Sequence, residues 1–144
     1  MRRIVYRLAP LSLSKDEIVA NTSLRIFDRQ RTVLLTTYRR DGTPVGTPVH
    51  IALDGDHAFF RTWGTAWKAK RIRQNANVEI APSTSSGKPT GPALPARARL
   101  LAGEESTRAA RALARKYPNM HGWIVPLVHR LRGNKTVHFE LTAR

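Results

Sequence analysis

The fold is decided by residues 33–82, which read VLLTTYRRDGTPVGTPVHIALDGDHAFFRTWGTAWKAKRIRQNANVEIAP. The opening segment, Val33–Tyr38, is rich in β-branched and aromatic residues and predicts a strand. It stops before Asp41-Gly42, a pair that supplies the positive φ of a tight hairpin turn. The returning strand, Val45–Leu53, contains Pro48, which has no N–H to donate to a neighbouring strand. Pro48 therefore predicts a sheet edge, a bulge or a place where something other than a strand is paired.

A second Asp-Gly pair, Asp54-Gly55, turns the chain into the strand His57–Thr62. Two consecutive hairpins predict an antiparallel meander. The spacing then changes, because Trp63–Asn77 carries small and apolar residues at helical intervals, with Lys68 in its first turn. Val78–Ala81 returns to the strand pattern. The stretch therefore predicts three strands, a short helix and a fourth strand.

The rest of the chain adds two strands and further helices. Residues 82–93 are rich in Pro, Gly and Ser and predict a loop that is too polar and broken to pack. Leu94–Ala102 alternates as a strand, and Thr136–Leu141 predicts the last one. Helices are predicted over residues 23–30, 104–117 and 123–131. On the helix over 104–117 we expect a Glu104–Arg108 ion pair and a buried face made of Ala110, Leu113, Ala114 and Tyr117.

A chain of 144 residues fits one domain. We assign residues 23–144 to this domain and residues 1–22 to an N-terminal appendage, in which Ser14 and Glu17 have the spacing of a capping box. No apolar run approaches the ~20 residues of a membrane-spanning helix, and we expect neither a membrane span nor a secretory signal. The absence of cysteine excludes disulfides and thiolate catalysis and is typical of a cytoplasmic protein.

The charge is strongly positive: 25 Lys and Arg stand against 10 Asp and Glu, a formal net charge of +15. Such a charge attracts anions, whether nucleic acid, an anionic membrane surface or a polyanionic small molecule. The basic residues are spread over the whole chain rather than massed in a tail or in one helix. This distribution argues against a specific nucleic-acid partner.

One cluster of basic residues has the arrangement of a phosphate site. Arg61 and Thr62 end a predicted strand, and Lys68, Lys70 and Arg71 follow in the next helix. A strand end followed by a helix start offers free backbone N–H groups, and nearby Lys and Arg add charge-assisted hydrogen bonds. A solvated basic helix face is the alternative interpretation.

Other chemistries find no support in the sequence. Residues 87–90, Gly-Lys-Pro-Thr, are similar to a Walker loop but lack its earlier Gly and have Pro where Ser or Thr is required. The histidines have no ligand spacing, so we predict no metal site, and no GxSxG elbow occurs. We name no catalytic residue. Trp63, Trp67 and Trp123 predict aromatic anchors of a core or dimer interface, with a ligand cavity as the alternative.

The order of these elements, with Asp-Gly after the first strand, resembles the pyridoxamine-phosphate-oxidase-like split barrel. Within that fold it is most similar to the flavin/deazaflavin oxidoreductase group that uses coenzyme F420. Residues 33–82 carry the resemblance, which extends more loosely over 31–142 through GKPTG at residues 87–91 and HFEL at residues 138–141. It implies a mainly β fold with α, namely a six-stranded antiparallel split β-barrel with flanking helices, assembled as a homodimer.

The resemblance also implies roles for individual residues. In the family, the strand end and helix start hold the cofactor's phosphate, and the strand with the internal proline lies beside the tricyclic ring. His50 on that strand would be a substrate contact or, alternatively, a partly buried packing residue, and Lys70 lies out of phase with Lys68 around a helix. The cofactor-binding residues implied are Thr47, Pro48, Val49, His50, Arg61, Thr62, Lys68, Lys70 and Arg71.

The function implied is an F420-dependent oxidoreductase that transfers a hydride between the deazaflavin and a small organic substrate. The phosphodiester and oligoglutamate tail of F420 are polyanionic, which suits the net charge. Three alternatives stay open. The same fold could hold FMN or a tetrapyrrole such as biliverdin or haem, it could store a cofactor without turnover, or the chain could be a basic nucleic-acid-binding module.

Overall fold

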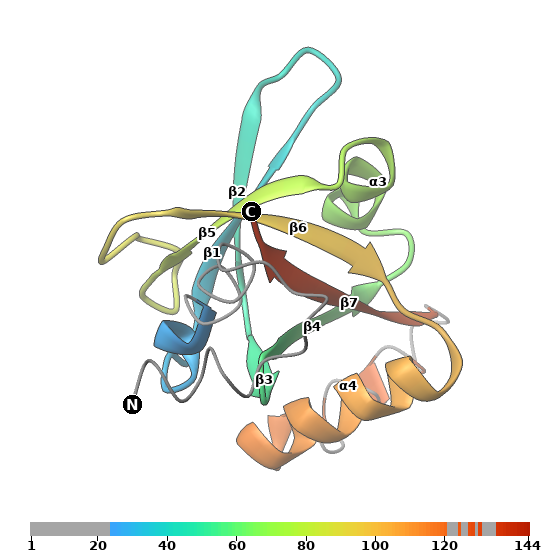
Figure 1. Ribbon diagram of the computed structural model, residues 1–144. Coiled ribbons are helices and arrows are strands. Elements are labelled where there is room, and N and C mark those ends of the chain that lie inside the picture. Colours follow the sequence, from blue (N-terminus) through green and yellow to red (C-terminus); the bar gives the residue numbers. More distant parts are fainter. Residues whose placement is uncertain (1–23, 121–123, 125–126, 129, 131–134) are drawn as a thin grey trace, which may run out of the picture.

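The computed structural model describes residues 24–120, 124, 127, 128, 130 and 135–144. These residues form one seven-stranded antiparallel sheet with flanking helices (Figure 1). The strands are β1 (Val33–Tyr38), β2 (Pro44–Val49), β3 (Ala52–Asp54), β4 (His57–Trp63), β5 (Asn77–Pro82), β6 (Leu94–Leu100) and β7 (Thr136–Ala143). The helices are the 3-10 helix η1 (Leu24–Phe27) and the α-helices α3 (Trp67–Gln74) and α4 (Gly103–Lys116). The mainly β fold with flanking helices is confirmed.

The sheet has seven strands rather than the predicted six, because the predicted strand Val45–Leu53 is divided at His50-Ile51. Its first half, β2, pairs with β1, while its second half, β3, pairs with β4. The strand order is β2-β1-β5-β6-β7-β4-β3, so these two successive strands lie at opposite edges of the sheet. The sheet must curl to let the chain pass from one edge to the other, which gives the split barrel seen along its axis in Figure 1. The sheet edge predicted from Pro48 is confirmed, since β2 is an edge strand.

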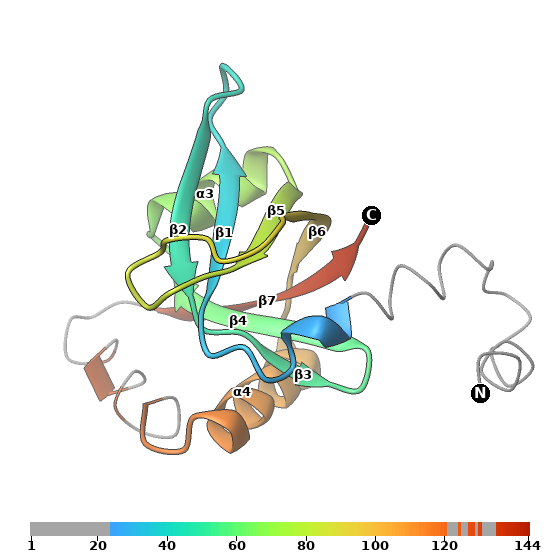
Figure 2. The ribbon, with the colours of Figure 1, turned by 90° about the vertical axis from the view of Figure 1, so that its left-hand side faces the viewer.

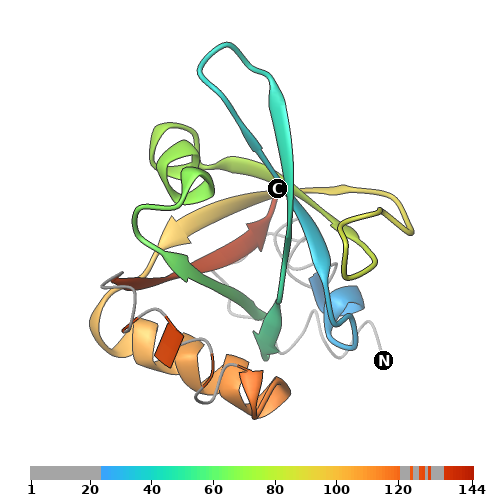
Figure 3. The ribbon, with the colours of Figure 1, turned by 180° about the vertical axis from the view of Figure 1, so that it is seen from behind.

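Two apolar clusters stabilise this arrangement. Alternation along β4 places Ala58 and Phe60 in the barrel interior, where Phe60 stacks on Phe139 with ring centroids 5.1 Å apart. Phe59, between them, faces outward into a second cluster beneath α4. Helix α3 adds Ala69 and Ile72 to the interior cluster. Figures 2 and 3 show the β1–β2 hairpin projecting from one end of the barrel and α4 lying across the opposite end.

The buried face of α4 differs from the predicted one. Leu113 and Tyr117 are buried as expected, whereas Ala110 and Ala114 are only half-buried. Ala109 and Ala112 are buried in their place, because α4 must cover β3, β4 and β7 at once, and these strands meet a different stripe of the helix. The predicted Glu104–Arg108 pair was also wrong, since Arg108 Nε donates to Asp54 Oδ2 at 2.7 Å, across the loop that follows β3.

The C-terminal end of α4 holds the segment between β2 and β3. Lys116 Nζ donates to the carbonyl oxygens of Ile51 at 2.8 Å and Gln30 at 2.6 Å. The Tyr117 hydroxyl lies 2.8 Å from the Ile51 oxygen and 2.7 Å from the Arg31 oxygen, and shares its single hydrogen between them. The bare carbonyls at the strand break are thereby satisfied.

The loop between β5 and β6 is exposed over most of its length, as its polar sequence predicts, but its start is anchored to the sheet. Ser83 is buried, and its N–H donates to the Thr32 oxygen at 3.2 Å. The Gln30 side chain donates to the Ser83 oxygen at 3.1 Å. At Gly87, where φ is +95°, an added Cβ would meet Pro48 Cδ at 3.3 Å, so the loop also lies close to β2.

Some predictions fall outside the described residues. The capping box at Ser14 and Glu17, the boundary at residue 22, the side chain of Trp123 and most of the predicted helix 123–131 are among them. They stay predictions. Within the described part of the chain, no helix is long and apolar enough to cross a membrane.

The Tyr117 hydroxyl makes the strand break testable. We expect Tyr117→Phe to lower the free energy of unfolding by about 1–3 kcal/mol, because carbonyls at a buried site lose a donor. Tyr38→Phe is the matched control: Tyr38 is half-exposed and lies at the end of β1 away from the strand break, so we expect a loss below about 1 kcal/mol. Urea unfolding of both variants measures the difference, and equal losses would contradict the role assigned to Tyr117.

Candidate functional site

A cleft of about 390 Å³ opens beside the break between β2 and β3. This volume falls within the range of about 300–1,000 Å³ that is typical of small-molecule sites. The end of β2, the end of β4, the start of α3 and two loops form its walls. We call it the β4–α3 cleft; it is lined by Arg31, Thr32, Pro48, Val49, His50, Arg61, Thr62, Trp63, Lys68, Ser85 and Met120.

The lining is basic without acidic counterparts. Arg31, Arg61 and Lys68 contribute three cations, and no Asp or Glu lies among the described lining residues. Lys68 is half-buried, and no ion pair joins it to a carboxylate of the described residues. Burial, together with the nearby Arg71 guanidinium, lowers the pKa of Lys68. A half-buried ammonium group in this setting is stabilised by a bound anion.

The start of α3 adds neutral donors at the same place. The helix is preceded by Ala66, whose side chain makes no capping hydrogen bond. The N–H groups of the first turn therefore have no partner inside the helix and no cap. They also carry the positive end of the helix dipole. A phosphate placed near Lys68 would satisfy both features.

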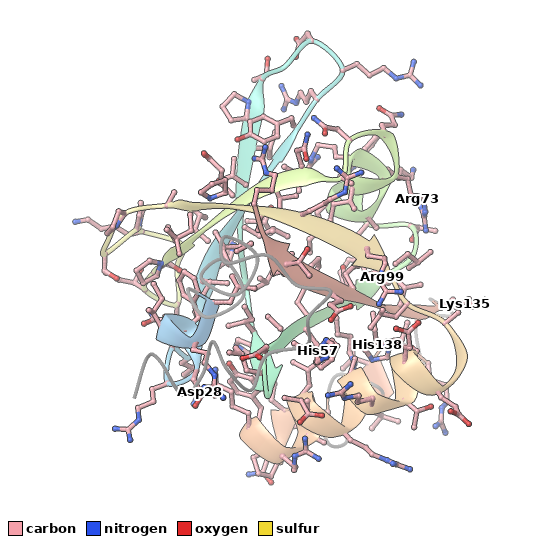
Figure 4. The ribbon with its side chains drawn as sticks, in the orientation of Figure 1. Asp28, His57, Arg73, Arg99, Lys135 and His138 are labelled. Carbon is pink, nitrogen blue, oxygen red and sulfur yellow. The ribbon has the colours of Figure 1, made fainter. Side chains whose placement is uncertain are left out.

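Arg61 is held in place by a chain of side chains that reaches α4. Its Nε donates to His138 Nε2 at 3.0 Å, and His138 Nδ1 lies 2.7 Å from Ser106 Oγ. Because an arginine can only donate, Nε2 is the acceptor, and a neutral His138 carries its proton on Nδ1 toward Ser106. Figure 4 shows His138 on β7 between the sheet and α4. Burial lowers the pKa of Arg61.

His50 lies at the strand break, with its ring stacked on Tyr117 at a centroid distance of 4.7 Å and an interplanar angle of 17°. Burial and the charges of Arg31 and Lys116 lower the pKa of His50. The imidazole facing the cleft is therefore neutral at pH 7. The packing role that the sequence offered as one alternative is confirmed, and His50 also lines the cleft, where a contact with substrate stays a prediction.

The structure brings most of the predicted site residues to this cleft. They are Pro48, Val49, His50, Arg61, Thr62 and Lys68. Thr47 lies on β2 opposite Leu35 and lines no cleft described here. Lys70 and Arg71 line a second hollow with Trp67 rather than the β4–α3 cleft, although the Arg71 charge still acts on Lys68. The predicted phosphate cluster is thus divided between two hollows.

Five lining residues were not assigned to the site from the sequence. Arg31 and Thr32 precede β1, and Ser85 lies in the loop between β5 and β6. Met120 follows α4, and Trp63 ends β4; the latter was considered only as an alternative cavity residue. No local motif signals the first four, because they reach the cleft through the pairing of segments far apart in the chain. Among the described residues, no cluster of His, Cys, Asp or Glu is suited to a metal ion.

The lowered pKa of Lys68 predicts a pH dependence for anion binding. Only the protonated amine attracts an anion, and a bound anion raises this pKa again. We therefore expect affinity for inorganic phosphate to fall as pH rises through the lowered pKa, by up to about tenfold per pH unit. Titrations followed by NMR between neutral pH and pH 10 measure it. Lys68→Met should abolish this pH dependence. The control variant Arg111→Gln, on the exposed side of α4, should keep it. If the affinity of the wild-type protein does not change with pH, Lys68 is not the group that binds the anion.

Solved structures of other proteins share the fold. The heme storage protein HutZ from Vibrio cholerae superposes with a TM-score of 0.64 at 15% identity, over 87% of this chain and 90% of that one. A conserved hypothetical protein from Mycobacterium tuberculosis has a TM-score of 0.60 at 21% identity, over 94% and 84%. A FAD-binding protein from Mesorhizobium loti has a TM-score of 0.60 at 15% identity, over 85% and 86%.

Such low identities show the fold alone, and no match is found among curated proteins. The sequence itself carries the stronger signal. The pyridoxamine 5′-phosphate oxidase family matches residues 21–143, which is most of the 144-residue chain. The chain belongs to this family.

Proposed function

We propose that the chain is an F420-dependent oxidoreductase that holds the cofactor's phosphate in the β4–α3 cleft and acts on a small organic substrate. One observation carries the proposal: the half-buried Lys68 ammonium lines the same cleft as Arg61 at the uncapped start of α3, and no ion pair joins Lys68 to a carboxylate of the described residues. An ammonium group that has lost part of its hydration without such a partner is suited to an anionic ligand.

The bound deazaflavin would supply the hydride chemistry, and the protein would supply binding and orientation. Lys68, Arg61 and the first-turn N–H groups of α3 would bind the phosphate. Pro48 would flank the ring without presenting an N–H that has no acceptor. Trp63 and Met120 would cover apolar parts of the ligand and exclude water. The neutral His50 imidazole would face the ligand or the substrate from the wall of the cleft.

The preference for F420 over FMN rests on charge and on resemblance. Both cofactors carry a phosphate that Lys68 and Arg61 would bind. Only F420 adds an oligoglutamate tail, which favours a chain with a net charge of +15. FMN is the alternative ligand of the same cleft, and the FAD-binding relative shows that a protein of this fold can hold a flavin.

A tetrapyrrole is a second candidate, favoured by His50. A haem iron needs a neutral imidazole, and the lowered pKa of His50 supplies one in the cleft. The similar protein HutZ is described as a heme storage protein. Titration with hemin decides this point: a Soret shift that His50→Ala abolishes would favour haem storage over F420 redox chemistry.

Lys68 gives the sharpest binding test. We expect Lys68→Ala to weaken F420 binding by about 1.5–3 kcal/mol, because a charge-assisted hydrogen bond to the phosphate is lost. Calorimetric or fluorescence titration with F420 and with FMN measures the loss and separates the two cofactors. Arg111→Ala removes a cation from the exposed side of α4 and should leave both affinities unchanged.

The same preparations test for turnover. Reduced F420 should be oxidised by a quinone, nitroaromatic or enone faster with the protein than without it. Arg61→Gln should lower this rate and still fold, because a glutamine can donate to His138 in place of Arg61 Nε. If Lys68→Ala leaves the affinity for the cofactor unchanged, the phosphate binds elsewhere. The proposed function is overturned if the protein binds a nucleic acid tightly and independently of salt but has no affinity for F420 or FMN.

We also propose a homodimer with two-fold symmetry. A cleft of about 390 Å³ in one chain lies near the lower end of ligand-site volumes, so a tricyclic ring with its phosphate needs a further wall. A second copy would supply it. We expect the dimer to bury more than about 2,000 Å², as obligate interfaces do. Sedimentation at micromolar concentration measures the state, and a monomer that binds F420 with full affinity would contradict the shared site.

A further inference from the structure

A second hollow, of about 650 Å³, lies along α3 and shares no lining residue with the β4–α3 cleft. Its walls are the outer part of the β1–β2 hairpin, which projects from the barrel in Figure 1, and the length of α3. We call it the hairpin groove. It is lined by Arg39, Arg40, Val45, Trp67, Lys70, Arg71 and Gln74.

The groove concentrates positive charge. Four of its seven lining residues are Lys or Arg, and none is Asp or Glu. The acid in the adjoining turn, Asp41, accepts a hydrogen bond from the Thr43 N–H at 2.9 Å and does not line the groove. Burial lowers the pKa of Arg71, and repulsion from the Arg39 charge lowers it further. A polyanionic ligand would relieve this repulsion.

The two walls are fixed relative to each other. Arg40 Nε, on the hairpin, donates to Gln74 Oε1 on α3 at 3.2 Å. Arg71 Nε, on α3, donates to Thr37 Oγ1 on β1 at 2.6 Å. Each bond uses one of the five guanidinium N–H donors. Both guanidinium groups are thus positioned by neutral partners, and neither forms an ion pair with a carboxylate of the described residues, an arrangement suited to the bidentate recognition of phosphate.

The groove also presents an aromatic surface. Trp67 is 72% exposed at the start of α3, and the Lys70 ammonium lies 4.6 Å from the centre of its ring. An indole has two faces, and this cation covers one of them. Stacking of a nucleobase on an aromatic side chain beside basic residues is a recurring mode of recognition, in which the ring binds the base and the cations bind the phosphates.

We propose that the hairpin groove binds a nucleoside phosphate, with its base stacked on Trp67 and its phosphates held by Arg39, Arg40, Lys70 and Arg71. A volume of about 650 Å³ and one aromatic residue suit a single nucleotide. A single-stranded nucleic acid needs a groove that follows several nucleotides and several aromatic residues. This site is separate from the β4–α3 cleft and does not rest on the function proposed for the cleft.

Titration of the full chain with ADP at low salt tests the proposal. We expect saturable binding of one ADP per chain. Trp67→Ala and Lys70→Gln should each weaken it about tenfold, because one removes the stacking surface and the other removes a charge-assisted bond. Trp67→Phe keeps an aromatic ring and should keep most of the affinity. Arg111→Gln, on the exposed side of α4, controls for net charge and should change nothing.

The nucleotide can be free or can be the nucleotide arm of a dinucleotide cofactor such as FAD, and competition separates the two sources. The groove holds the nucleotide arm of FAD if ADP displaces FAD and if Trp67→Ala weakens the binding of FAD but not that of FMN. ADP affinity that saturating FAD leaves unchanged assigns it to a separate nucleotide. Either result supports a nucleoside phosphate in the groove.

Three outcomes overturn the proposal: no ADP binding up to millimolar concentration, ADP binding that is unchanged in both Trp67→Ala and Lys70→Gln, or inorganic triphosphate binding as tightly as ADP. Binding of a single-stranded oligonucleotide without ADP binding also overturns it and would assign the groove to nucleic acid. Failure here is distinguishable from failure of the cleft, because the cleft is tested with Lys68→Ala and FMN or F420.

Discussion

The carbonyl oxygen of Ile51 is the point on which the barrel depends. The chain leaves β2 at Val49 and enters β3 at Ala52, and these strands occupy opposite edges of the sheet. At the crossing, the backbone leaves one ladder before it joins the next, so its polar groups need other partners. Lys116 and Tyr117, at the end of α4, supply them. Closure of the sheet and docking of α4 therefore share these contacts.

This closure also builds the β4–α3 cleft. Ending β2 at Val49 leaves His50 beside the end of β4, and Tyr117, which holds the Ile51 carbonyl, stacks on the His50 ring. Arg61 is positioned from the same side, because His138 on β7 connects it to Ser106 on α4. The fold and the site thus share their supporting contacts. A change in how α4 packs would move both walls of the cleft.

The sequence predicts what depends on neighbours along the chain and misses what depends on distant partners. Strand alternation and two Asp-Gly turns locate β1, β4 and the hairpins to within a few residues. The split of Val45–Leu53 follows from pairing with two different strands, which no local pattern encodes. The Arg61–His138 contact joins residues 77 positions apart, so no local pattern predicts it either. The place of Lys68 in the cleft could be predicted because the start of a helix is a local feature of the sequence. The place of Lys70 and Arg71 in a different hollow could not, because it depends on what packs against each face of α3.

The distribution of acids explains why the two hollows are suited to anions. The described carboxylates that form ion pairs lie on β3, β7, α4 or the turn after β3; they are Asp54, Asp56, Glu105 and Glu140. They pair with arginines at that end of the molecule, where Arg99, labelled in Figure 4, bridges Glu105 and Glu140. On the side of α3, no Asp or Glu is among the described residues that line the cleft or the groove. A partly buried charge without an acidic partner opposes folding. In the cleft the half-buried Lys68 carries this penalty, and a bound anion would offset it.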